Sequence, residues 1–177
     1  MHAHEIVTSF LDAVTRDPNA YRAYETNASW TPLATLALVE AGRAAFPQGI
    51  ASAKGSQDRY GRSEYLALDA CIWTDDWKPP LFVAEHDNYP VKDRIQYSAW
   101  KLLTVTAQRR VLVCYFKSEG RSSEVRSFRE VTAAVAEVCE QNLGKDVIVI
   151  AADCVAADSN VALRRLFESA IVGFPAR

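Results

Sequence analysis

The sequence predicts an α/β fold in which helices cover both faces of a mixed central β-sheet. Residues 109–116 (RRVLVCYF) and 146–153 (DVIVIAAD) are largely apolar runs of strand length, typical of strands buried on both faces. Beyond residue 80, segments with strand character alternate with segments whose apolar residues recur at helical spacing. Such alternation implies right-handed crossovers between strands that are at least partly parallel.

Length and composition indicate one globular domain. The 177 residues, of which 49% are hydrophobic and 24% charged, suit a single domain with a sizeable core. We assign 1–177 to this domain, with a helix and loop at 1–30, a core at 31–153 and a further element at 154–177. The net charge of −2 means that a nucleic-acid partner would require a local basic patch.

The cysteines and the apolar segments indicate a cytoplasmic protein. The four cysteines are widely spaced and form no CxxC pair, so we expect buried, reduced thiols. The first residues show no basic segment followed by an apolar core, so we expect no signal peptide. No apolar run reaches transmembrane length, and we expect no membrane partner.

Helices are predicted at the beginning of the chain. Apolar residues recur at helical spacing over 4–14, and a loop or short helical turn follows at 21–30. Thr31 as N-cap and Pro32 as first helical residue open a second helix, which reaches Pro47. Its apolar residues lie nearly all round the helix, so we expect it to be well buried.

Two short strands, at 64–73 and 81–85, come next and form an apparent hairpin. Acidic residues and prolines at 75–80 make the turn between them. The preceding segment, 49–63, is rich in glycine, serine and charged residues, and we assign it mainly to a loop, with room for a short strand around Ile50.

The second half of the chain alternates helices with strands. The predicted elements are, in order, a helix at 91–106, a strand at 109–116, a helix from about 123 to 143 and a strand at 146–153. Ser122 or Ser123 is the expected cap of the second of these helices. Residues 161–174 fit both a helix and a strand, and both interpretations stay open.

Three acidic residues lie within or at the ends of the two short strands. Because strand side chains alternate between faces, Asp69 lies on one face of the first strand, and Glu85 and Asp87 share one face of the second. If these strands are neighbours, three carboxylates meet and repel one another. A divalent cation would relieve the repulsion, and Mg²⁺ prefers a few carboxylates with water and phosphate oxygens. The sequence therefore predicts a Mg²⁺ or Mn²⁺ site.

This arrangement resembles the PD-(D/E)xK nuclease superfamily, which has the restriction-endonuclease-like fold. In that family an acid on one strand and a D/E-x-K tripeptide on the next bind the metal and activate water, within a core of order α-β-β-β-α-β. Asp69 would take the place of the first acid, and Glu85-His86-Asp87 would occupy the tripeptide. Residues 32–152 follow this order, with a helix inserted before the third strand.

The resemblance also implies roles for residues on the helices. Asp87 stands where the family has lysine, and the family often moves that lysine to the following helix, where Lys101 is the candidate. Gln96 resembles a glutamine on the equivalent helix of some family nucleases, and Glu40 matches an acid of the preceding helix and would be a further metal ligand. The implied activity is metal-dependent hydrolysis of DNA or RNA, with Glu85, Lys101 and Gln96 as the catalytic residues. Nucleic acid and a homodimer are the expected partners.

Simpler interpretations of the same acids stay open. Glu85 and Asp87 also fit a strand end that caps the next helix. Asp69 also fits a structural acid with a buried partner such as Arg43 or Lys101, because an unpaired charge is costly to bury.

The other candidate residues have simpler interpretations too. Lys101 also fits a surface lysine, and Glu40 also fits an ion pair with Arg43. Alternation directs His86 to the opposite face, where we expect a solvated histidine. Three tryptophans are expected to pack rather than to stack on bases, namely Trp73, Trp77 and Trp100.

Two further functions therefore compete with the nuclease. One is a catalytically inactive protein of the same fold that serves as a binding or assembly module. The other is an α/β domain that binds a small molecule or a protein, with purely structural acids. The sequence contains no GxSxG, HExxH, GxxxxGK[ST] or GxGxxG motif.

Overall fold

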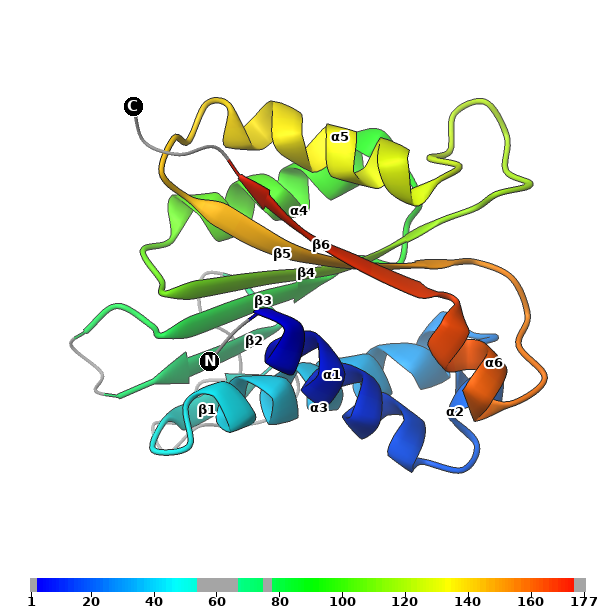
Figure 1. Ribbon diagram of the computed structural model, residues 1–177, viewed down its shortest axis with the longest axis horizontal. Coiled ribbons are helices and arrows are strands. Elements are labelled where there is room, and N and C mark those ends of the chain that lie inside the picture. Colours follow the sequence, from blue (N-terminus) through cyan, green and yellow to red (C-terminus); the bar gives the residue numbers. More distant parts are fainter. Residues whose placement is uncertain (1–2, 54–66, 75–77, 174–177) are drawn as a thin grey trace.

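The computed structural model describes residues 3–53, 67–74 and 78–173, and it has an α/β architecture with a mixed, open sheet of six strands (Figure 1). The predicted fold class is confirmed at this level. The first part of the predicted strand 64–73 and Trp77 lie outside the described residues.

The strands follow one another across the sheet in the order of the sequence. They are β1 (Ile50–Ala53), β2 (Ala70–Trp73), β3 (Phe82–His86), β4 (Arg109–Phe116), β5 (Asp146–Asp153) and β6 (Phe167–Gly173). Strands β1, β2 and β3 pair antiparallel, β3, β4 and β5 pair parallel, and β6 is antiparallel to β5. As predicted, helices connect the parallel strands.

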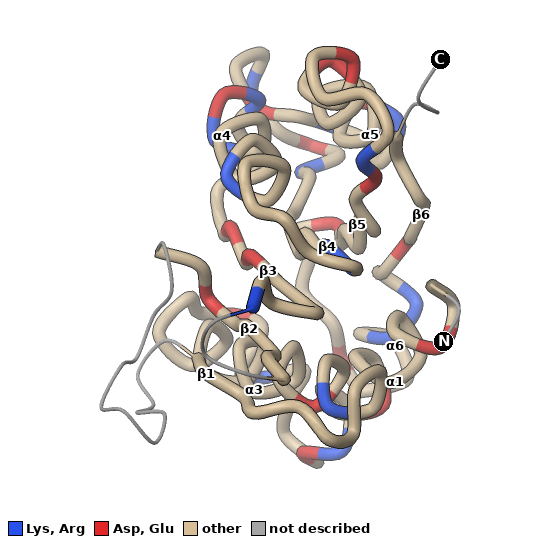
Figure 2. The backbone as a smooth tube through the Cα atoms, turned by 90° about the vertical axis from the view of Figure 1, so that its left-hand side faces the viewer, with Lys and Arg blue, Asp and Glu red and all other residues tan. Residues whose placement is uncertain are grey.

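Helices cover both faces of the sheet (Figure 1). They are α1 (Ala3–Arg16), α2 (Ala20–Ala23), α3 (Asn27–Ala45), α4 (Lys92–Thr104), α5 (Phe128–Cys139) and α6 (Asn160–Arg165). Figure 2 shows α4 and α5 side by side on one face, with α1 and α3 on the other.

Each face of the sheet buries its own hydrophobic core. In β4, Val113 and Tyr115 pack in the core shared with α1 and α3, whereas Leu112 and Cys114 pack in the core shared with α4 and α5. Alternating side chains of one strand therefore serve two separate cores, as expected for a strand buried on both faces.

The helix predicted to begin at Pro32, with Thr31 as its cap, begins five residues earlier, at Asn27. Thr26 is the N-cap, and its hydroxyl accepts a hydrogen bond from the Ser29 amide. Pro32 therefore lies inside α3 rather than at its first position. The hydroxyl of Thr31 instead accepts from the Asn88 side chain at 2.7 Å, so a long-range contact uses the residue that was expected to cap the helix.

The helix after β4 begins later than predicted, at Phe128. Ser127, rather than Ser122 or Ser123, is its N-cap and accepts from the Glu130 amide. The preceding segment contains turns and is fixed through Val125, whose amide donates to Pro90 O and whose carbonyl accepts from the Lys117 amide.

A third difference concerns β1, which forms within the segment assigned mainly to a loop. With β1 included, three strands precede α4, and among the described residues no helix lies between them. The strand is short and lies at the edge of the sheet, which explains its weak sequence signal. The ambiguous segment 161–174 divides into most of α6 followed by β6.

Three of the four cysteines are buried, as expected, and the exposed Cys154 is an exception. No cysteine takes part in a disulfide. In the described part of the chain, no helix has the length and apolar character needed to cross a membrane.

Candidate functional site

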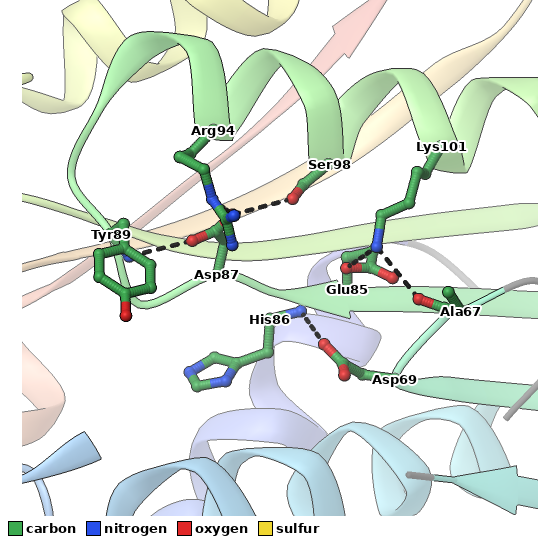
Figure 3. Close-up of polar contacts among 9 residues, drawn as sticks. All are labelled: Ala67, Asp69, Glu85, His86, Asp87, Tyr89, Arg94, Ser98 and Lys101. Atoms are coloured by element: carbon green, nitrogen blue, oxygen red, sulfur yellow. Dashed lines mark hydrogen bonds and ion pairs between the residues drawn. The ribbon is translucent and has the colours of Figure 1, made fainter. Parts of the chain in front are cut away.

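Three consecutive residues at the end of β3 alternate between the two faces of the sheet (Figure 3). Glu85 and Asp87 contact side chains of α4, whereas His86 contacts Tyr115 on the opposite face. All three are buried. The predicted grouping of Glu85 with Asp87 on one face is confirmed. His86 does lie opposite them, but the expectation that it is solvated was wrong, because it is enclosed by the core on that face.

Lys101 reaches from α4 to the buried carboxylate of Glu85. The Nζ atom lies 2.8 Å from Glu85 Oε2 and donates to Ala67 O at 3.1 Å. The Lys101 side chain is 16% exposed and that of Glu85 is 5% exposed, so this lysine points inward rather than along the surface. Within the described residues, Oε1 of Glu85 is buried without a hydrogen-bond partner.

Asp69 lies at a bend before β2, rather than inside a strand as predicted. Ala67, two residues earlier, has a positive φ of 57°, which interrupts the extended conformation. The Asp69 amide donates to Ala84 O, and its carboxylate accepts from the His86 amide at 2.8 Å. The carboxylate thus bonds a main-chain donor of β3 just beyond the last paired residues of the β2–β3 ladder.

The electrostatics of the site place Glu85 and Asp69 in the same neighbourhood. Burial raises the pKa of Glu85 from 4.5 to about 7, and the negative charge of Asp69 adds to this effect. The ammonium of Lys101 lowers this pKa, and the more minor influence of Asp87 raises it. Burial also raises the pKa of Cys71 to about 12, with Glu85 and Asp69 as further causes. Glu85 can therefore exchange a proton near neutral pH.

Asp87 is fully engaged in the turn between β3 and α4. One oxygen accepts from the Tyr89 amide at 3.0 Å, and the other accepts from the Ser98 hydroxyl at 3.1 Å. The Nε atom of Arg94 lies 3.3 Å from the second oxygen. Asp87 lies just after the strand end, as the simpler interpretation has it, but it does not cap the next helix, because Val91 is the N-cap of α4 and, among the described residues, no side chain bonds the cap.

Two predicted site residues are not brought to Glu85. Gln96 points to α5, where its amide donates to Glu137 Oε2 at 2.7 Å. Glu40 of α3 pairs with Arg16 of α1 at 2.9 Å, not with Arg43. Both side chains lie on helix surfaces that contact a neighbouring helix, which helical spacing within one segment does not reveal.

The tryptophans divide into packing and exposed residues. Trp73 packs against the core on the α4 side, as expected. Trp100, which was expected to pack, is half exposed and stacks on Tyr97. The sequence prediction failed because it did not establish which face of α4 meets the sheet.

A chain of buried polar aromatic contacts, which the sequence did not indicate, lies on the opposite face. Trp30 donates to the Tyr115 hydroxyl, and Nε2 of His86 lies 2.7 Å from the same oxygen. A cavity of about 290 Å³ next to these aromatic residues is lined by residues that include Trp30, Tyr115 and Asn88. No local pattern links Trp30 with Tyr115, because 85 positions separate them.

The predicted metal ligands Asp69, Glu85, Asp87 and Glu40 are not gathered into one group, because Glu40 pairs with Arg16. Over 3–53, 67–74 and 78–173, no three His, Cys, Asp or Glu side chains are arranged to hold a metal ion. No protein-family model, curated protein or solved structure matches this chain. The functional argument therefore depends on the geometry around Glu85.

Proposed function

We propose that this chain is a metal-dependent phosphodiesterase of restriction-endonuclease-like fold that cleaves DNA or RNA. The observation that carries the proposal is the meeting of three side chains from separate parts of the chain. Lys101 of α4 contacts Glu85 of β3, and the charge of Asp69, at the start of β2, acts on Glu85. A relocated lysine beside two acids is what the family resemblance implies.

The order of elements supports the same proposal. Helix α3, strands β1, β2 and β3, helix α4 and strand β4 occupy residues 27–116 in the order α-β-β-β-α-β. Because β2 and β3 are antiparallel, the beginning of β2 lies beside the end of β3. Asp69 and Glu85 are therefore neighbours although 15 residues separate them in the sequence.

The two acids suit a hard cation that is completed by water and phosphate. Glu85 Oε1 is a buried acceptor without a hydrogen-bond partner among the described residues, and a second carboxylate, Asp69, is close enough to raise its pKa. Mg²⁺ commonly uses only one or two carboxylates. Asp69 and Glu85 would hold the ion, and the bound ion would supply Lewis acidity and a more acidic water.

The residues of the chain itself have two further tasks. The Lys101 ammonium, already directed at the site, would stabilise negative charge that develops on a phosphate oxygen. Glu85, whose pKa burial raises to about 7, would release its proton to bind the ion, so metal binding should strengthen as pH rises through neutrality. Gln96 and Glu40 take no part, because α5 and α1 hold their side chains elsewhere.

Cleavage of a labelled oligonucleotide with and without Mg²⁺ or Mn²⁺ tests the proposal. We expect Asp69→Asn, which keeps an oxygen for the His86 amide, to reduce cleavage by about 100-fold or more. Glu40→Gln is the matched control and should cleave like the parent protein. Cleavage by Asp69→Asn at the parent rate would reject the assignment.

A second candidate is the non-catalytic binding module of the same fold. Two observations favour it: Asp87 occupies the position of the family lysine and is fixed by Arg94 and Ser98, and Lys101 already occupies one oxygen of Glu85. This candidate predicts no cleavage and no change in melting temperature on addition of Mg²⁺. A Mg²⁺-dependent rise in melting temperature that is lost in Asp69→Asn would contradict it.

A further inference from the structure

Exposed aromatic side chains are concentrated on one segment of the protein. Among the described residues, eight large hydrophobic side chains are exposed, and the three aromatic ones are Tyr89, Tyr97 and Trp100, at 56%, 54% and 50%. All three belong to α4 or to the loop that precedes it. Aromatic residues are more often buried, and a cluster of exposed ones commonly marks a binding surface.

Two of these rings form a platform on the outer face of α4. Tyr97 and Trp100 are three positions apart, so they share one helix face, and their rings are stacked with centroids 5.9 Å apart and planes at 24°. A shallow groove of about 440 Å³ runs between α4 and α5 beside them. It is lined by Gln96, Tyr97, Trp100, Glu137, Val138 and Gln141.

Cationic groups accompany the rings. The Arg94 guanidinium lies 5.2 Å from the Tyr89 ring centroid, and the Lys101 ammonium lies 5.5 Å from the Tyr97 ring centroid. Helix α4 carries three basic residues and one acidic residue, whereas the whole chain has a net charge of −2. Each of these basic side chains lies beside a carboxylate, Lys92 beside Glu137, Arg94 beside Asp87 and Lys101 beside Glu85. Lys92 and Arg94 nevertheless stay 52% and 57% exposed. Solvent-accessible cations therefore accompany the exposed rings, a combination with which proteins bind single-stranded nucleic acids.

The same cations connect the platform to the candidate site. Lys101 bonds Glu85, and Arg94 pairs with Asp87 while its side chain stays 57% exposed. A strand bound across α4 would place its phosphates beside Arg94 and unpaired bases on the rings. In a duplex each base already stacks on its neighbours, so exposed rings favour unpaired bases.

We infer that the outer face of α4, with Tyr97 and Trp100 as stacking rings and Arg94 as a phosphate contact, binds single-stranded nucleic acid next to the Glu85 site. The inference rests on the proposed function only in naming the substrate, because binding itself requires no cleavage. The substrate class of the α4 surface is therefore single-stranded nucleic acid, bound without preference for a particular base sequence.

Fluorescence anisotropy of a fluorescein-labelled oligothymidylate, about twelve nucleotides long, tests the inference in EDTA, where metal-dependent cleavage is absent. We expect Trp100→Ala and Tyr97→Ala each to weaken binding about tenfold or more, and Trp100→Phe to retain most of it. Leu36→Ala, an equally exposed apolar residue of α3 on the opposite layer, is the matched control and should bind like the parent protein. Binding should fall with salt, with a slope of log affinity against log salt of about −1 to −2.

The outcomes separate this inference from the proposed function. Binding that depends on Trp100, in a protein that cleaves nothing, would support the platform and reject the phosphodiesterase. Cleavage of duplex with unchanged oligonucleotide binding in Trp100→Ala would support the phosphodiesterase and overturn the platform. Absence of oligonucleotide binding, together with self-association that Trp100→Ala removes, would identify the surface as a protein interface and also overturn it.

Discussion

On the α4 side of β3, Glu85 is held by the ammonium of Lys101, whereas on the α1–α3 side His86 contacts the hydroxyl of Tyr115, which Trp30 also contacts. The first set is charged and lies beneath a helix whose outer surface is open to solvent. The second set consists of aromatic rings enclosed in the core. Adjacent residues of one strand thus occupy two environments that differ in charge and in access to water.

The two sides of β3 therefore suit different purposes: the Glu85 side suits acid–base chemistry, and the Tyr115 side suits stability. Glu85 has a pKa near 7, so its charge changes under ordinary conditions, and cations from α4 can reach it. Burial raises the pKa of Tyr115 well above its ordinary value, so its hydroxyl stays neutral and serves as a fixed hydrogen-bonding group. We therefore expect substitutions on the α4 side to act through pH and charge, and substitutions on the opposite side to act through packing and hydrogen bonding.

The largest expected effect concerns Glu85→Gln and pH. Between pH 4.5 and about 7 the folded protein keeps a proton on Glu85 that the unfolded chain releases. The free energy of unfolding of the parent protein therefore falls as pH rises through this window, by about 3 kcal/mol from this group. Glu85→Gln lacks this contribution, so its stability relative to the parent protein should rise by that amount over the same window.

Urea unfolding of both proteins across this pH range measures the effect. Parallel stability curves for the parent protein and Glu85→Gln would show that the buried carboxylate does not titrate as described. Stability would then be as independent of pH on the Glu85 side of β3 as we expect it to be on the His86 side.

A smaller effect is expected on the neutral side, from Tyr115→Phe. Removing the hydroxyl leaves the buried Trp30 donor and His86 Nε2 without this bonding partner, at a cost of about 2 kcal/mol in unfolding free energy. Tyr21→Phe is the control, because the hydroxyl of Tyr21 accepts a solvent-exposed bond from Arg22. Equal stability of the two variants in urea unfolding would mean that the buried contacts of the Tyr115 hydroxyl with Trp30 and His86 do not stabilise the protein.

The smallest effect separates the two cations of α4. Lys101→Met should raise the pKa of Glu85 further and destabilise the protein by about 1 kcal/mol at about pH 8, with little effect near pH 5, where Glu85 is protonated in both proteins. Arg94→Gln should change stability by less than about 0.5 kcal/mol, because its side chain is largely exposed. An equal loss of unfolding free energy for both variants at both pH values would mean that burial of the Lys101–Glu85 pair does not affect stability.

Many of the helices and strands could be predicted because the local periodicity of apolar residues indicates them. Strands β4 and β5 have the predicted bounds, α1 nearly so, and the alternation of β3 correctly separated His86 from Glu85 and Asp87. Each of these predictions needs only the repeat of a strand or helix and the order of neighbouring elements.

Other features depended on partners far away in the chain. Helical spacing did not show that Gln96 would face α5, that Glu40 would meet Arg16 of α1, or that Trp100 would face solvent.

Asp69 shows the same limit at the level of a single residue. Alternation was extrapolated through a strand that bends there, and its carboxylate instead accepts a main-chain bond from His86. The periodicity of a segment determines which residues can be buried together, whereas the packing of the whole chain determines which neighbour each of them meets.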